Sequence, residues 1–311
     1  IDLLIGADPP CDCLRTSMSG EDDDLQLARF NPEVHLQPTH SVLIFGGSGT
    51  GKTVVAENFL WGMRKRAGAM VCFLGTTDTV QEFARHLPRP FVRHGFLPEQ
   101  LQAIIDAQTQ IKMMVETEVL RAGVLGIAAP HHLINFVVMI DDMGFAPQLL
   151  SSEAVKYAFS NARHDGMMPM LMLQYSKMAC PVVRENATLI CLAKTDNMAS
   201  IEKLHELFPC FETPEELRRA LDQLKTREFL IYDKRSHDAG KRPYLFFYKA
   251  QFPCPEFVLE AEGPWLWAYQ HVKRADVHEM NRRIIAGENL ASEASPAPAK
   301  ATASKRGGKR A

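Results

Sequence analysis

Residues 46–53 read GGSGTGKT and directly follow the apolar run of residues 41–45. The octapeptide matches G-x-x-x-x-G-K-[ST] at every fixed position, and its glycines let backbone N–H groups point at phosphate oxygens. A helix that begins at Lys52 adds the positive end of its dipole, its lysine reaches the β- and γ-phosphates, and the Thr53 hydroxyl contacts Mg²⁺. The flanking strand and helix favour this interpretation over a plain glycine-rich turn. The sequence therefore predicts a nucleoside-triphosphate site formed by Gly46, Gly47, Ser48, Gly49, Thr50, Gly51, Lys52 and Thr53.

Two consecutive aspartates, Asp141 and Asp142, end the apolar run of residues 135–140. Such a run is typical of a strand buried on both faces of a parallel sheet, and ligands bind at the carboxyl ends of these strands. We expect Asp141 to hold Mg²⁺ beside Thr53, and Asp142 to orient or deprotonate the attacking water. A turn or a helix cap would use the same residue type. Because two aspartates occur in succession downstream of a phosphate loop, we favour Mg²⁺ binding and water activation over a turn or a helix cap.

Three further polar residues lie around a second apolar strand, residues 169–173. Gln174 ends this strand and can donate to a γ-phosphate oxygen or orient water. Arg163 and Arg184 lie in the loops on either side of it, where a guanidinium can meet the charge of a transferring phosphoryl group. By residue type alone, Gln174 could equally be an ordinary polar residue at a strand end. Each arginine could equally be a surface residue paired with a carboxylate.

These residues belong to a longer pattern, which has an Arg-His pair before a strand, a glutamine that closes the strand, and an R-x-N triplet shortly after it. The segments of the pattern are IDDM at 140–143, NARHDG at 161–166, QYSK at 174–177, PVVREN at 181–186 and YLFFYKA at 244–250. Together they resemble the DNA-packaging ATPases of poxviruses and other large DNA viruses. Those proteins belong to the FtsK–HerA superfamily of hexameric DNA pumps. The resemblance runs from about residue 38 to residue 250.

The resemblance implies a function and assigns roles. Gln174 would sense the γ-phosphate, Arg163 would be a finger that acts on the neighbouring subunit's nucleotide, and Arg184 a second finger or a subunit contact. The cofactors would be ATP and Mg²⁺. The chain would form a homo-oligomeric ring, a hexamer, that drives double-stranded DNA into a preformed capsid, with a capsid or portal component as partner. We expect it in the host cytoplasm, the viral factory and the virion, or in the nucleus.

Other functions stay open from the sequence. A cellular or plasmid DNA-pumping ATPase of the same superfamily would serve conjugation, chromosome segregation or repair, but such proteins usually carry membrane spans or extra domains. A nucleotide-dependent switch or scaffold would bind ATP without pumping DNA, and would not need Asp142, Gln174 and Arg163. A small-molecule kinase is disfavoured because no acceptor-site motif is evident.

Composition narrows the class of protein. The chain has 311 residues, 46% of them hydrophobic, and a formal net charge of −2. This length allows one large α/β domain with appendages, and the charge requires any nucleic-acid binding to come from local basic surfaces. The seven cysteines lack a disulfide or zinc-site pattern and indicate reduced, intracellular thiols. No apolar run reaches the about 18 residues of a membrane span, so we expect a soluble protein without a membrane partner.

The elements that must position the site follow from apolar periodicity. Strands are predicted over 41–45, 70–74, 135–140, 169–173 and 188–192, and helices over 54–67, after 76–78, over 98–121 and from 151 or 152 to 163. Their alternation predicts an α/β P-loop NTPase fold of the RecA or ASCE type, a parallel sheet with helices on both faces. Segments 229–232 and 244–248 are predicted as short β additions near the end of the domain, in a hairpin-like pair.

Four regions are expected along the chain. They are an acidic N-terminal arm at 1–37, the ATPase domain at 38–250, a C-terminal helical extension at 251–291 and a disordered basic tail at 292–311. The tail's lysines and arginines suit DNA contact, nuclear targeting or solubility equally. Two basic spots, Lys225–Arg227 and Lys241–Arg242, would face a central pore or, as the favoured interpretation, simply solvent.

Overall fold

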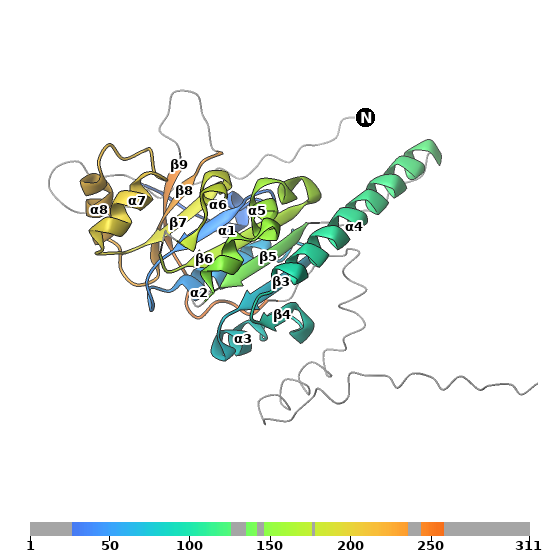
Figure 1. Cartoon of the computed structure of the whole chain (residues 1–311), viewed down its shortest axis with the longest axis horizontal. Coiled ribbons are helices and arrows are strands. Elements are labelled where there is room, and N and C mark those ends of the chain that lie inside the picture. Colours follow the sequence, from blue (N-terminus) through green and yellow to red (C-terminus); the bar gives the residue numbers. More distant parts are fainter. Residues whose placement is uncertain (1–26, 126–134, 142–145, 176–177, 236–243, 258–311) are drawn as a thin grey trace, which may run out of the picture. The chain divides into compact units, whose positions relative to one another are not determined.

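The computed structural model describes residues 27–125, 135–141, 146–175, 178–235 and 244–257. Within these residues, nine strands form one sheet in the order β1-β9-β8-β7-β2-β6-β5-β3-β4 (Figure 1). The five strands from β7 to β3 run parallel to one another, as the sequence predicts. These strands are Leu189–Ala193 (β7), Val42–Phe45 (β2), Met167–Leu173 (β6), Phe136–Asp141 (β5) and Ala69–Leu74 (β3).

The remaining strands extend this parallel core on both sides. β8 (Glu228–Asp233) runs antiparallel to β7, and β9 (Tyr244–Lys249) runs antiparallel to β8. The predicted β additions are thus confirmed as neighbouring antiparallel strands. The two edges are short: β1 (Ala28–Arg29) pairs with β9, and β4 (Val92–His94) pairs with β3.

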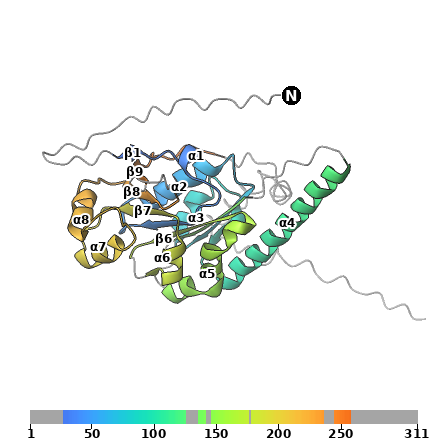
Figure 2. The ribbon, with the colours of Figure 1, turned by 90° about the horizontal axis from the view of Figure 1, so that it is seen from above.

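Helices cover both faces of the sheet, which confirms the predicted layering (Figure 2). One face packs against α1 (Pro32–His35), α2 (Lys52–Met63) and α3 (Thr77–Phe83). The other packs against α4 (Pro98–Leu125), α5 (Glu153–Ser160), α6 (Pro181–Asn186), α7 (Met198–His205) and α8 (Pro214–Asp222). The far half of α4 extends beyond the sheet (Figure 1).

Alternate residues of β2 explain why the central strands are apolar without interruption. Leu43 and Phe45 belong to the core on the α4–α8 face, whereas Val42 and Ile44 belong to the core on the α2 face. All four side chains are buried. A parallel strand covered on both faces must be hydrophobic at every position, so no alternation of polar and apolar residues is seen.

The structure differs from the sequence-based elements in several places. α2 begins at Lys52 and ends at Met63, four residues before the predicted end. The helix predicted to reach residue 163 stops at Ser160, so that Arg163 lies in the 3-10 turn η3 (Ala162–Asp165). α6, α7 and α8 were not predicted, because helices of six to nine residues hold too few turns for a clear apolar period.

The termini are described only in part. The end of the expected N-terminal arm packs into the domain, since Phe30 and Leu36 are buried. Residues 1–26, most of the expected helical extension from residue 258, and the basic tail lie outside the described residues, as do Lys241–Arg242. In the part of the chain that is described, no helix combines the length and the apolar character that a bilayer span requires.

Candidate nucleotide-binding site

The octapeptide of residues 46–53 forms a loop between the end of β2 and the start of α2. The Gly46 N–H donates to the Leu173 carbonyl at the end of β6, at 3.1 Å. A Cβ on Gly46 would lie 2.5 Å from Thr50 Oγ1 and 2.8 Å from Ala193 Cβ, so only glycine fits this position. Gly51 has φ +96°, a left-handed conformation that glycine adopts without strain. Gly46 is therefore required by close packing, and Gly51 is favoured by backbone conformation.

The loop curls around the carbonyl of Gly47. Lys52 Nζ and Thr50 Oγ1 both donate to that carbonyl at 2.9 Å. Gly51 precedes α2 and provides no side-chain cap, so the first N–H groups of the helix are not capped from that position. Uncapped N–H groups at a helix N-terminus, next to an ammonium group, form a site for a phosphate chain.

Asp141 and Gln174 follow strands on one side of this loop. β6 lies between β2 and β5, so Gln174, after β6, is next to the loop and Asp141, at the end of β5, is one strand further away. Asp141 is 3% exposed, and its carbonyl accepts from the Gly75 N–H at 3.1 Å. Burial first, and then the charge of Asp141, raise the pKa of the Cys72 thiol. Asp142 lies outside the described residues, so its role stays a prediction.

The oxygen donors suit a magnesium ion. Thr53 lies in the first turn of α2, and Asp141 lies at the same carboxyl edge of the sheet. The described residues contain no group of three or more His, Cys, Asp or Glu that could hold a metal by themselves. A nucleotide-bound Mg²⁺ needs only one or two protein oxygens, because phosphates and water complete its shell. The donor set therefore fits Mg²⁺ delivered with a nucleotide.

The two predicted arginines lie at the opposite edge of the sheet. Arg163 comes just before β6, and Arg184 comes just before β7. Both strands run parallel to β2, so these arginines are at the amino ends of the strands, whereas the phosphate loop is at the carboxyl end. β6 has 7 residues, about 23 Å at ~3.3 Å per residue. One chain therefore does not bring its arginines together with its own phosphate loop.

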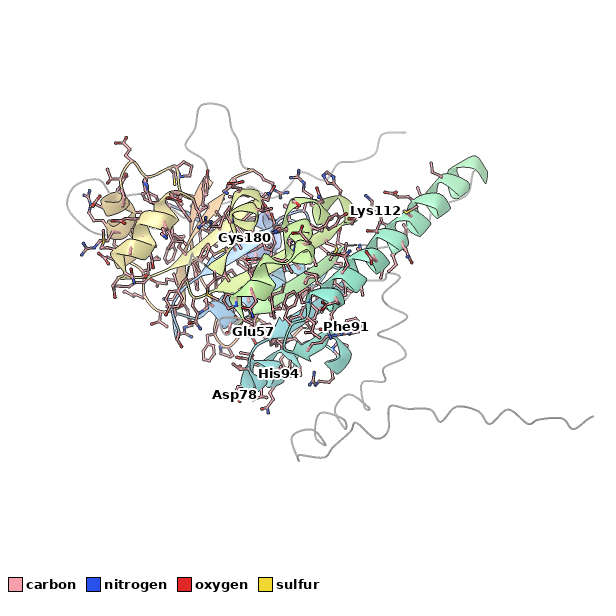
Figure 3. All side chains as sticks on the ribbon, viewed as in Figure 1. Glu57, Asp78, Phe91, His94, Lys112 and Cys180 are labelled. Carbon is pink, nitrogen blue, oxygen red and sulfur yellow. The ribbon has the colours of Figure 1, made fainter. Side chains whose placement is uncertain are left out.

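The turn that carries Arg163 is held by its neighbours. Gln108 of α4, which is fully buried, donates from Nε2 to the Asp165 carbonyl at 2.9 Å. The Tyr157 hydroxyl is 3.0 Å from Asp165 Oδ2. Lys112 of α4, which is labelled in Figure 3, donates to the His164 carbonyl. Arg163 itself is exposed. The backbone is thus fixed while the guanidinium remains accessible to another molecule.

Two cations that the sequence analysis missed join this edge. Lys234 Nζ donates to the Arg184 carbonyl at 3.2 Å, and burial lowers the pKa of its ammonium. Burial also lowers the pKa of Arg235. The charge of Asp233 opposes this shift, and the smaller effect of Arg163 adds to it. The sequence pattern that could have indicated them is the Lys-Arg pair that directly follows an apolar strand. The pair lies at the amino edge because β8 runs antiparallel to β7 and ends there, which the sequence pattern does not show.

Arg227 makes further contacts that were not predicted from the sequence. Its N–H donates to the Thr50 carbonyl in the phosphate loop at 3.0 Å, and a Cβ on Gly51 would lie 2.6 Å from Arg227 Cγ. Its φ is 67°, the single positive value for a non-glycine residue among those described. The favoured interpretation of this basic spot as solvated surface did not include these contacts of Arg227 with the phosphate loop. The sequence gives no local signal for a contact between segments so far apart.

A buried asparagine ties α2 to the segment that follows β9. Asn58 is 4% exposed, and its Nδ2 donates to the carbonyls of Val54 at 2.8 Å and Gln251 at 3.0 Å. Its Oδ1 accepts from the Gln251 N–H and from the Tyr248 hydroxyl, both at 2.9 Å. This clamp fixes residues 250–252 relative to the helix that begins with Lys52.

We expect Asn58→Ala to lower the free energy of unfolding by about 2–4 kcal/mol, because buried partners of the amide lose their hydrogen bonds together. Chemical denaturation followed by circular dichroism measures the change. The matched control is Asn186→Ala, which removes an exposed amide with one hydrogen bond to the Val182 carbonyl. We expect that control to cost less than about 1 kcal/mol. Equal losses in the two variants would contradict the clamp.

The sheet order, the phosphate loop and the acidic strand end define an α/β P-loop NTPase fold. No family model matches the chain. A protein of Invertebrate iridescent virus 3, the uncharacterised protein 088R, is 21% identical over 238 residues, which cover 74% of this chain and 84% of that protein.

Solved structures similar to the chain include a viral packaging protein. The genome packaging NTPase B204 from Sulfolobus turreted icosahedral virus 2, in complex with AMPPCP, has a TM-score of 0.47 and 16% identity, over 70% of this chain and 100% of that chain. EssC (ATPases 2 and 3) from Geobacillus thermodenitrificans has a TM-score of 0.48 and 11% identity, over 80% of this chain and 44% of that chain.

Proposed function

We propose that the chain is an ATP-hydrolysing translocase of double-stranded DNA that packages a viral genome and works as a hexameric ring. The observation that carries the proposal is the division of the site between two edges of the sheet. The phosphate loop, Asp141 and Gln174 lie at the carboxyl edge, and Arg163 and Arg184 lie at the amino edge. A head-to-tail ring joins two different surfaces of neighbouring subunits. In this proposal, those surfaces are the amino edge of one sheet and the carboxyl edge of the next.

In the proposed reaction, the N–H groups of the loop and Lys52 hold the phosphates of ATP. Thr53 and Asp141 would hold Mg²⁺, which neutralises charge on the β- and γ-phosphates when it is bound. Asp142 orients or deprotonates the attacking water, and Gln174 contacts the γ-phosphate from the end of β6. Arg163 of a neighbouring subunit stabilises the charge that spreads over the transferring phosphoryl group, with Arg184 as a second finger or subunit contact.

The DNA substrate and the capsid partner in this proposal rest on the resemblance of residues 38–250 to viral packaging ATPases. With a formal net charge of −2, the chain would contact DNA through local basic surfaces. The proposed locations are the host cytoplasm or viral factory and the virion, with the nucleus as an alternative. A DNA pump of a cell or plasmid would use the same nucleotide site, whereas a scaffold would not need the separated arginines.

The test is ATP hydrolysis by the parent chain with and without double-stranded DNA, combined with displacement of a third strand from a DNA triplex. We expect DNA to raise the hydrolysis rate several-fold and the triplex strand to be released only with ATP. Single-stranded DNA of the same length is the control substrate. Hydrolysis that ignores DNA, without strand release, would leave an ATPase and contradict the translocase.

A further inference from the structure

The phosphate loop has a second flank, on the side away from Gln174 and Asp141. There the sheet continues from β2 through β7 and β8 to β9. β8 is antiparallel to β7 with Phe229 opposite Ala193, and Lys249 of β9 lies opposite Glu228. The start of β8 and the end of β9 therefore lie at the same carboxyl edge as the loop. Arg227 and the segment 250–252 are the residues that the fold places there.

Arg227 and Phe252 form a stack at this flank. The guanidinium carbon of Arg227 lies 4.9 Å from the centroid of the Phe252 ring. The backbone of Arg227 is bonded both to the loop, through the Thr50 carbonyl, and to the segment after β9, because its carbonyl accepts from the Ala250 N–H at 2.9 Å. Phe252 is 61% exposed, although it is a large apolar side chain.

The position of this stack is fixed on two sides. The Asn58 side chain donates to the Gln251 carbonyl and accepts from the Gln251 N–H. Gln251 is the residue directly before Phe252. Arg227 holds a positive φ that costs conformational energy for any residue with a side chain. A glycine would hold this backbone without strain, so the side chain at 227 needs its own explanation. The explanation we offer is that a guanidinium is needed at 227 to stack with the aromatic ring of Phe252 beside the phosphate loop.

We propose that the Arg227–Phe252 stack is the platform for the nucleobase of the nucleotide held by residues 46–53. This inference rests on the proposed nucleotide binding. In the proposed function, Gln174 and Asp141 take the γ-phosphate end of the ligand on the β6 side of the loop. The base would then leave on the β7 side, where the stack lies. Phenyl rings and guanidinium planes both stack on bases. Stacking accepts any base, so it favours nucleoside triphosphates over inorganic triphosphate without selecting one base.

Calorimetric titration with two probes, Mg-ATP and Mg-bound inorganic triphosphate, tests the platform. We expect Phe252→Ala to weaken the binding of ATP about tenfold and to leave that of triphosphate unchanged, because only ATP carries a base. Phe252→Trp should retain the affinity of the parent for ATP. Arg227→Gly, which keeps the backbone conformation, should weaken ATP binding several-fold. Val34→Ala, which shortens another exposed apolar side chain, is the matched control.

The outcomes separate this inference from the proposed function. A parent chain that binds neither probe would contradict nucleotide binding itself. A parent that binds both, with the ratio of the two affinities unchanged in Phe252→Ala and Arg227→Gly, would overturn the platform alone. Equal weakening of both probes would assign Phe252 a structural role and would also overturn it. Phe252→Leu keeps an apolar side chain at this position but removes the aromatic ring, so we expect it to weaken ATP binding and not triphosphate binding, as in Phe252→Ala.

Discussion

Lys52→Ala is expected to lower the rate of ATP hydrolysis at least about 100-fold, the range seen when a group that stabilises transition-state charge is removed. The Lys52 ammonium is 2.9 Å from the Gly47 carbonyl, within the loop that would surround the phosphates. When a nucleotide binds, the ammonium would exchange this carbonyl for β- and γ-phosphate oxygens. No other side chain of the loop carries a positive charge.

The measurement is the steady-state rate of phosphate release, with ATP affinity determined separately. The matched control is Lys65→Ala, which removes an exposed lysine just beyond the end of α2. We expect the control to keep the rate of the parent and both variants to keep its unfolding midpoint. If Lys52→Ala hydrolysed ATP at the rate of the control, the loop of residues 46–53 would not be the catalytic site.

The local parts of the site could be predicted from the sequence because each is encoded by neighbouring residues. The loop at 46–53 is a contiguous pattern, and β2, β5 and β6 are apolar throughout since both sheet faces are covered. In the structure, the strand that Gln174 follows lies next to the strand that ends at Asp141. The roles of these side chains stay predictions.

The missed parts depend on strands that return from late in the chain. Arg227 contacts Thr50 because β8 runs antiparallel to β7 and starts beside the phosphate loop. Lys234 reaches the Arg184 carbonyl because the same strand ends at the opposite edge. Strand direction is not encoded in the residues of a single strand, so neither contact follows from a local pattern. A basic residue at either end of β8 looks the same as a solvated one.

Arg163→Ala is expected to lower ATP hydrolysis by about 10³-fold, the lower end of what a finger supplied in trans contributes. The side chain is exposed and its turn is held by Gln108 and Tyr157, so truncation should leave the fold and the affinity for ATP unchanged. Arg163→Lys should restore little, because a lysine lacks the planar fork of donors. The matched control is Arg218→Ala, an exposed arginine of α8 beside Asp222.

Mixed subunits distinguish a finger in trans from a role within one chain. Arg163→Ala subunits keep an intact phosphate loop, and Lys52→Ala subunits keep an intact Arg163. In rings reassembled from equal amounts, about one site in four pairs an intact loop with an intact neighbouring arginine, since a head-to-tail interface joins two different surfaces. We therefore expect the mixture to recover up to about a quarter of the parent rate. If Arg163 acted on the nucleotide of its own chain, no mixed site would be complete and the mixture would stay inactive. That second result would also remove the reason for a ring, because the amino edge of the sheet would then have no part in catalysis.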